Sequence, residues 1–290
     1  MVWLVSLFIF AVIATIVVCA YLLRRHFEQS LREDVRTLKA MSQAFVPSSV
    51  GADLPPPVAH YRRVAVGELV PVHTMRMTHG GTFRMSPVSK ALPIEGTQLF
   101  TVDPPGFLWT GRVHLANGIW IDARDSAIAG RGCARVLLDD VVPLAHARGP
   151  HVDQGAALRL LAEMVWYPTS LFDPRNVTWS PIDADHARAS LRVGRTEVSG
   201  IFEFGADGLP VAMSAERYID EGELRPWRGV YRDWRIVMGM HVPFEVVATW
   251  QLASGPFAYA HWIIYSISYD SDFAADNIAA PSHRRALRAS

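Results

Sequence analysis

Two absences limit the chemistry open to this chain: it lacks paired cysteines and it lacks a net charge. Two cysteines occur among 290 residues, Cys19 and Cys133, and neither belongs to a CxxC pair. Structural disulfides and a zinc site are therefore not expected. Lys and Arg together number 28, as do Asp and Glu, so no overall field attracts nucleic acid. The arginines form no stripe with interleaved aromatic residues, and the sequence predicts no nucleic-acid partner.

Catalytic and metal-binding motifs are also missing. The sequence has no HExxH, GxSxG, P-loop or EF-hand pattern. Acidic residues gather in IDADH (182–186) and DSD (270–272), but both groups lie among turn residues, where aspartate bends the chain. The motifs therefore predict no catalytic residue, no metal ligand and no cofactor.

A long apolar run is present at the N-terminus. Residues 2–23 carry no charge and are numerous enough to cross a bilayer as one helix. No basic residue precedes the run, which favours a retained anchor over a cleavable signal peptide. Arg24 and Arg25 follow it directly. The positive-inside rule then predicts a single-pass protein of the cell membrane with its large domain in the cytoplasm, the opposite side being the alternative.

Four further segments follow the apolar run. Residues 24–45 are predicted to continue as a juxtamembrane helix, because apolar side chains recur at helical spacing among charges. Proline, serine and glycine make 46–58 a linker. A β-rich soluble domain is predicted over 59–270, and the small basic tail 271–290 is predicted to be disordered.

The soluble domain is patterned as successive β-hairpins. Extended segments surround turn signals at Gly80-Gly81, Asn117-Gly118, Asp207-Gly208 and 254–256. About ten strands are expected in one large antiparallel sheet, by the usual strand and turn lengths.

One helix interrupts the strands and is predicted over 153–165. Asp153 is the expected N-cap, and Pro168 prevents much continuation past Tyr167. A single helix cannot cover such a large sheet unless the sheet curls around it. The predicted fold is therefore mainly β (α+β): a large curved antiparallel sheet or half-barrel wrapped around one helix, preceded by the transmembrane helix.

The hairpin at Asn117-Gly118 offers a first candidate site. A two-residue turn pairs 113 with 122 and 111 with 124. That register places seven residues on one face: Phe107, Trp109, Val113, Leu115, Trp120, Asp122 and Arg124. Aromatic residues with a few convergent polar groups suit a ligand pocket. The alternative is that both charges lie at the wet edge of the sheet, and a one-residue shift would move them and Trp120 to the other face.

The helix itself carries the second candidate, Glu163. The apolar stripe of the helix leaves Glu163 on its flank, one turn from Arg159. One interpretation is a boundary ion pair between the two. The other is that the sheet buries this flank, in which case Glu163 needs a specific cationic partner, for which Arg217 is predicted. Trp166 and Tyr167 either cap a cavity or pack in the core.

Several motifs resemble an uncharacterised bacterial family of membrane-anchored proteins. They are LPPPVAHYRR, PPGFLW, RLLAEMVWYPTSL, VTWSPID and GMHVPFEVVATWQL, and the resemblance spans roughly residues 54–270. Its most specific element is the Glu-x-x-Trp-x-Pro run of Glu163, Trp166 and Pro168. The layout of a sheet around a helix is also similar to lipoprotein carriers and receptors of the bacterial envelope, whose half-open barrels hold acyl chains. That second resemblance implies a soluble domain outside the cytoplasm.

Three functional hypotheses follow. The first is a membrane-anchored module that binds a hydrophobic ligand, such as a lipid or acyl chain, through Trp109, Trp120, Asp122, Arg124, Glu163, Trp166, Tyr167 and Arg217. The second is an enzyme acting on an apolar substrate, with Glu163 as general acid or base. The third is a non-catalytic structural or assembly domain that uses the helix at 24–45 to pair with a partner. The space between the helix at 153–165 and the sheet discriminates between them. A cavity there would favour binding or catalysis, and a filled interior would favour the structural or assembly domain.

Overall fold

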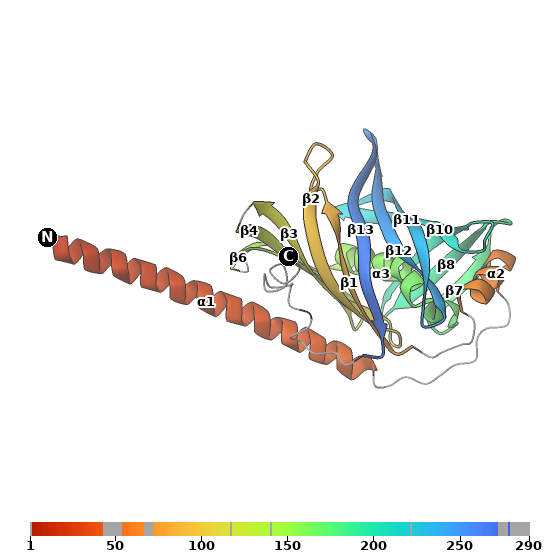
Figure 1. The fold of residues 1–290 in the computed structure, drawn as a ribbon, viewed down its shortest axis with the longest axis horizontal. Coiled ribbons are helices and arrows are strands. Elements are labelled where there is room, and N and C mark those ends of the chain that lie inside the picture. The colour runs from red at the N-terminus through yellow and green to blue at the C-terminus, as the bar shows by residue number, and fades with distance from the viewer. Residues whose placement is uncertain are drawn as a thin grey trace, which may run out of the picture.

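The computed structural model describes residues 2–42, 54–66, 72–116, 118–139, 141–220, 222–271 and 278. Within these residues the strands form one 13-stranded antiparallel sheet (Figure 1). The strands are β1 (Thr74–Phe83), β2 (Leu92–Thr101), β3 (Gly106–Ala116), β4 (Ile119–Ile128), β5 (Arg131–Leu138), β6 (Val142–Ala147), β7 (Val177–Pro181), β8 (His186–Val193), β9 (Thr196–Phe204), β10 (Pro210–Asp220), β11 (Glu223–Val237), β12 (Met240–Leu252) and β13 (Gly255–Tyr269). The helices are α1 (Val2–Met41), α2 (Pro56–Ala65) and α3 (Pro150–Glu163).

The order of the strands explains why the sheet curls. It runs β6-β5-β4-β3-β2-β1-β13-β12-β11-β10-β9-β8-β7, so the first and last strands pair at the centre. From the edge strand β6 the chain crosses through α3 to the opposite edge, β7. Thirteen flat strands would be about 58 Å wide, whereas a helix of 14 residues spans only about 21 Å. The two wings must therefore approach each other, and the sheet folds around α3 as the predicted half-barrel (Figure 1).

Helix α3 packs inside this curl and contacts strands of both wings, β4 and β5 on one side and β8, β9 and β10 on the other. It begins at Pro150 after an N-cap at Gly149, so the prediction of Asp153 as N-cap is wrong. Asp153 lies in the first turn, where its Oδ1 accepts a hydrogen bond of 2.6 Å from the backbone N–H of Gly132 in β5. Short 3₁₀ turns at Met164–Trp166 and Pro168–Phe172 follow Glu163, so α3 does not continue past Tyr167, as the position of Pro168 predicted.

Helix α1 merges the predicted membrane span and most of the predicted juxtamembrane helix. The part from Val5 to Met41 is long and apolar enough to cross a membrane, and its most apolar window contains no buried residue. The C-terminal part of α1 contacts the outer face of β2, β3 and β4. There Leu31, Val35 and Leu38 form a small second core with Leu99 and Leu108 of the sheet. The half-barrel is therefore packed directly against the helix that precedes it.

The predicted linker 46–58 extends too far, because α2 begins at Pro56. Pro57 and Val58 are buried in that helix, while residues 43–53 lie outside the described part of the chain. Prolines are tolerated in the first helical turn, where the backbone N–H has no partner within the helix. The proline run therefore starts a helix that packs against β8 and β12, and the folded domain begins before residue 59.

Three of the predicted hairpin turns are confirmed and one is wrong. Turns connect β3 to β4, β9 to β10, and β12 to β13. Gly80 and Gly81, however, lie within the continuous strand β1. A Cβ at Gly80 would collide with the Tyr265 ring, and Gly81 has φ 130° and lies against the backbone of His261. The pair permits close approach of β13 rather than a turn.

Most of the predicted disordered tail lies outside the described residues. Ile278 is described, and there the prediction is wrong, because this residue is fully buried beside α1. Its carbonyl oxygen accepts a hydrogen bond of 2.6 Å from the Thr110 hydroxyl.

Candidate functional site

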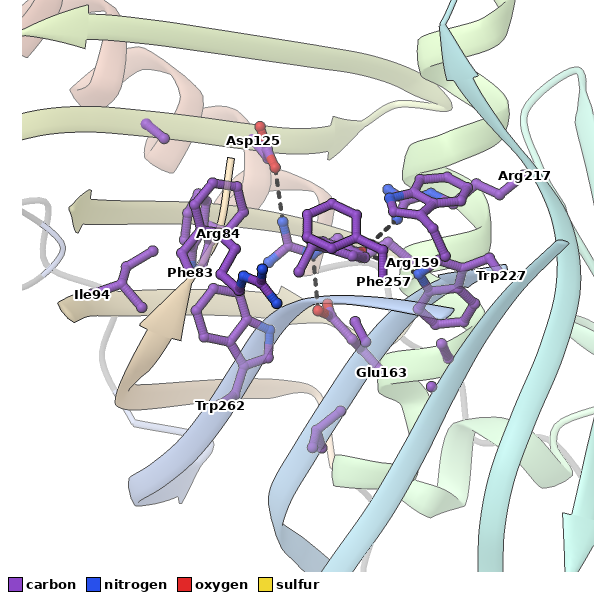
Figure 2. A pocket seen from close by; sticks show the side chains of 18 of the residues that line it. Phe83, Arg84, Ile94, Asp125, Arg159, Glu163, Arg217, Trp227, Phe257 and Trp262 are labelled. Carbon is purple, nitrogen blue, oxygen red and sulfur yellow. Dashed lines mark hydrogen bonds and ion pairs between the residues drawn. The ribbon is translucent and has the colours of Figure 1, made fainter. Parts of the chain in front are cut away.

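A cavity of about 600 Å³ lies between α3 and the concave face of the sheet. This volume is within the range of about 300–1,000 Å³ that is typical of small-molecule sites. Most of the wall is apolar or aromatic, with Ile94, Trp109, Val113, Ile121, Val246, Ala248, Trp250, Phe257 and Trp262 contributed by strands of both wings. Five charged residues complete it: Arg84, Asp125, Arg159, Glu163 and Arg217 (Figure 2).

Arg159 of α3 is the centre of a polar network on the cavity wall (Figure 2). Its Nε donates to Glu163 Oε1 at 2.8 Å, and its Nη1 donates to Asp125 Oδ2 of β4 at 2.9 Å. Its Nη2 donates to Gln98 Oε1 of β2 at 3.0 Å, and Gln98 in turn donates to Glu163 Oε2 at 2.6 Å. The guanidinium also lies over the Trp109 ring, 5.0 Å from its centroid. The network ties α3 to two strands of one wing.

Burial governs the ionisation of this network. It raises the pKa of the Glu163 carboxyl above its usual value, although Arg159 and Gln98 act in the opposite direction. Burial alone would lower the pKa of Arg159, but Glu163 and Asp125 hold it above its usual value. Glu163 also lines the cavity, as the enzyme hypothesis requires. Each carboxylate oxygen of Glu163 already accepts a hydrogen bond, however. Glu163 could therefore act as a general acid or base only if its bond to Arg159 or to Gln98 were broken.

The indole of Trp109 forms a second element of the wall, together with His79 behind it. Trp109 Nε1 donates to His79 Nε2 at 2.7 Å, and the imidazole also lies 4.6 Å from the Trp262 ring. The indole crosses two glycines of neighbouring strands: a Cβ at Gly96 would lie 2.8 Å from Trp109 Nε1, and one at Gly111 would collide with the ring. The glycines of β2 and β3 therefore allow Trp109 to lie flat along the cavity.

The C-terminal end of α3 is fixed by side-chain hydroxyls of the other wing. Tyr231 donates to the carbonyl oxygen of Ala162 at 2.8 Å, and Tyr269 donates to that of Trp166 at 2.6 Å. These bonds satisfy carbonyl groups that a helix end leaves without partners. The Trp166 indole donates to the Pro243 carbonyl at 2.9 Å while its side chain lines the cavity.

Four of the predicted site residues line the cavity, namely Trp109, Glu163, Trp166 and Arg217. Tyr167 does not line it: its side chain is buried in the core, with its ring 5.1 Å from Phe100. Glu163 is buried, as one of the two interpretations required, but its partner is Arg159 and the prediction of Arg217 in that role is wrong. Arg217 instead donates to the Tyr259 hydroxyl at 3.1 Å.

The predicted face of the β3–β4 hairpin is wrong for Trp120, Asp122 and Arg124. A bulge between His114 and Ala116 shifts the register by one residue, so 112 pairs with 122 and 110 with 124. The three side chains therefore lie on the outer face of the sheet. There Asp122 accepts a hydrogen bond of 2.8 Å from Arg112, and Arg124 contacts Asp34 of α1 at 3.5 Å. The same shift turns Ile121, Ala123 and Asp125 toward the cavity.

The sequence did not point to four residues of the cavity and its polar network: Arg84, Gln98, Asp125 and Tyr259. The correct register would have identified Asp125, because it alternates with Ile121 and Ala123 on one strand face. The sequence gives no comparable signal for Gln98, which faces Glu163 across 65 positions of the chain.

Comparison with known proteins gives a family and a distant similarity of fold. Residues 44–262 match the family described as "Family of unknown function (DUF6544)", and the chain belongs to this family. This confirms the predicted resemblance to an uncharacterised family. No curated protein matches the chain.

Solved structures that are similar to this chain include two from bacteria. A putative outer membrane lipoprotein-sorting protein domain from Vibrio parahaemolyticus aligns with a TM-score of 0.46 and 9% identity, over 77% of this chain and 94% of that one. A LolA superfamily protein from Nitrosomonas europaea aligns with a TM-score of 0.39 and 10% identity, over 77% of this chain and 96% of that one.

Proposed function

We propose that this member of the DUF6544 family binds a hydrophobic ligand, such as a lipid or an acyl chain, in the cavity between α3 and the sheet. The observation that carries this proposal is the cavity itself, about 600 Å³ with a largely apolar and aromatic wall. Protein interiors are otherwise close-packed, and an unfilled apolar space lowers stability. A structural or assembly domain has no need of such a space, whereas a binding module does.

The packing of α1 supports a site beside a membrane. The apolar part of α1 is the proposed anchor, and its C-terminal part is packed on the outer face of the half-barrel. The cavity would therefore be held close to the bilayer rather than tethered by a flexible chain. The basic residues Arg24 and Arg25 that follow the apolar run favour the cytoplasmic side of the cell membrane.

A cavity-filling variant tests the proposal. Ala248 lines the cavity and is 5% exposed, so Ala248→Phe places a ring where the ligand would lie. The ring takes up space that the ligand would fill, and the expected loss of bound ligand is at least about tenfold, which corresponds to about 1.4 kcal/mol of binding free energy. Lipids extracted from the purified full-length chain would be identified and quantified by mass spectrometry.

The matched control is Ala258→Phe, because Ala258 is exposed on β13 and does not line the cavity. The wild-type chain and this control should carry the same apolar ligand in similar amounts. Finding no apolar ligand in the wild type, or equal amounts in Ala248→Phe, would contradict the proposed function.

A further inference from the structure

The charged side chains around the cavity fall into two groups. Arg159 pairs with both Asp125 and Glu163, so the network already described carries one net negative charge. Arg84 and Arg217 have no such partner, since neither forms an ion pair with a carboxylate anywhere in the described residues. The five charged side chains of the wall, three arginines and two carboxylates, therefore sum to one net positive charge, and Arg217 also acts on Glu163 electrostatically. Arg84 and Arg217 are half-buried, and an anion that approaches them would offset this surplus of positive charge.

Arg217 is the more strongly held of the two. Its guanidinium lies 5.8 Å from the centroid of the Trp227 ring and 5.7 Å from that of Trp250. Its Nε is buried and has no hydrogen-bond partner. Gly155 of α3 lies opposite it, where a Cβ would be 3.5 Å from this Nε. Arg217 therefore retains an unused donor in a position fixed by two aromatic rings.

Tyr259 adds a second donor at the same place. Its hydroxyl oxygen accepts hydrogen bonds from Arg217 Nη1 and from Trp227 Nε1, both at 3.1 Å. A phenol that accepts two hydrogen bonds keeps its own O–H to donate. Tyr259 lines the cavity, so this O–H and the Arg217 guanidinium can serve one acceptor.

Arg84 contributes positive charge on the same wall. It lies over the Phe257 ring at 5.5 Å, and the Phe257 and Tyr259 rings are 6.4 Å apart. Its Nε donates to the Ser89 carbonyl at 3.1 Å and its Nη2 to the Pro87 carbonyl, so neutral groups leave its charge uncompensated.

We propose that Arg217 and Tyr259 bind the anionic head group, a carboxylate or a phosphate, of an acyl amphiphile whose chain fills the apolar part of the cavity. This rests on the proposed function and adds the chemical class of the ligand. A charge-assisted hydrogen bond to the head group satisfies the unused donor of Arg217, and the aromatic wall covers the chain.

Quenching of tryptophan fluorescence by brominated ligands tests this inference, since Trp109, Trp227, Trp250 and Trp262 line the cavity. The full-length chain in nonionic micelles is titrated with brominated stearic acid, with the matching brominated alcohol, and with a brominated acyl chain that carries a phosphate head. Each probe is compared between wild type and variant, so its partition into micelles cancels. The acid and phosphate arms distinguish the two sources of the anionic head, and tight binding of either supports the inference.

Arg217→Gln should raise the half-quenching concentration of the anionic probe at least tenfold, roughly the value of a hydrogen bond to a charged group. Binding of the alcohol should change less than about twofold, because the apolar wall is intact. Arg217→Lys should retain most of the preference for the anion, and Tyr259→Phe should lose part of it. Arg235→Gln is the matched control, since Arg235 pairs with Asp233 on the surface and does not line the cavity.

The outcomes separate the two proposals. If the alcohol and the anions quench equally well, and Arg217→Gln changes neither, the anion site is refuted while the hydrophobic site is still supported. Equal loss of every probe in both Arg217→Gln and Arg217→Lys would also overturn it, because the effect would not depend on charge. Absence of quenching by any probe in the wild type would refute the proposed function itself.

Discussion

Replacing Arg159 with methionine is expected to lower the free energy of unfolding by about 3–5 kcal/mol, the usual cost of removing one partner from a buried ion pair. Arg159 donates to Glu163, Asp125 and Gln98, and its side chain is 15% exposed. Methionine fills a similar volume but leaves the buried Glu163 carboxylate with Gln98 as its one remaining donor in the network. The loss should therefore come from an uncompensated charge rather than from a packing defect.

Thermal unfolding of the full-length chain measures this effect. A decrease of 3–5 kcal/mol corresponds to a decrease in Tm of roughly 6–20 °C for a domain of this size. Arg192→Met is the matched control, because the Arg192–Glu197 pair is 73% and 60% exposed and should contribute at most about 1 kcal/mol.

A second substitution separates charge from shape. Adding Glu163→Leu to Arg159→Met removes the carboxylate that had lost its partner, and part of the Tm should return, since buried ion pairs can be replaced by apolar residues at little cost. A Tm for Arg159→Met that matches the Arg192→Met control would show that the network contributes little. A double variant less stable than the single one would point to packing as the cause.

The curl of the sheet could be predicted from the sequence because it follows from periodicity and area. Val246, Ala248 and Trp250 alternate along the sequence, a pattern typical of a strand with one buried face, and the structure places all three on the cavity wall. A single helix can cover the apolar faces of so many strands only if the sheet curves around it. The strands and the helix can be predicted because each is encoded by the spacing of apolar residues that are close together in the sequence.

The register of the β3–β4 hairpin could not be predicted in the same way. An ideal turn at Asn117-Gly118 gives one pairing, but the bulge before Ala116 gives the other and reverses the face of every following residue. Trp120, Asp122 and Arg124 were therefore assigned to the wrong side. The outer position is stabilised by α1, through contacts of Arg124 with Ser30 at 2.9 Å and Asp34 at 3.5 Å, which no local pattern encodes.

The partners of the charged residues were the least predictable part of the candidate site. Arg159 and Glu163 are four residues apart, so their pairing was one of the two interpretations considered. Gln98 and Asp125 reach the same network from β2 and β4, and only the curl of the sheet brings them to α3. Residues that meet across such sequence distances give no periodic signal.

Acidification is expected to destabilise the protein through His79, by up to about 5 kcal/mol as the pH falls from 6.5 to 3. His79 is 2% exposed, and burial, with a further contribution from the Arg159 charge, lowers its pKa from 6.5 to about 3. In the unfolded chain the imidazole takes up a proton below about pH 6.5, which the folded protein cannot do until about pH 3. The contribution to stability is therefore complete above pH 6.5 and is lost as the pH falls through this window.

The structure also explains why the neutral ring is required. His79 Nε2 accepts the hydrogen bond from Trp109 Nε1, so a proton on Nε2 would break that bond and place a second positive charge near Arg159. His79→Gln keeps a hydrogen-bond acceptor for Trp109 but cannot be protonated in this range. Denaturant unfolding from pH 7.5 to 4.5 gives the free energy of unfolding of the wild type and of this variant. Carboxylates titrate in both proteins, so their effect cancels in the difference between the two free energies. The wild type should lose about 2–3 kcal/mol more than His79→Gln by pH 4.5. Parallel profiles would mean that the folded protein accommodates the proton on His79, and the wall formed by Trp109 and Trp262 would then have to open to solvent in acid.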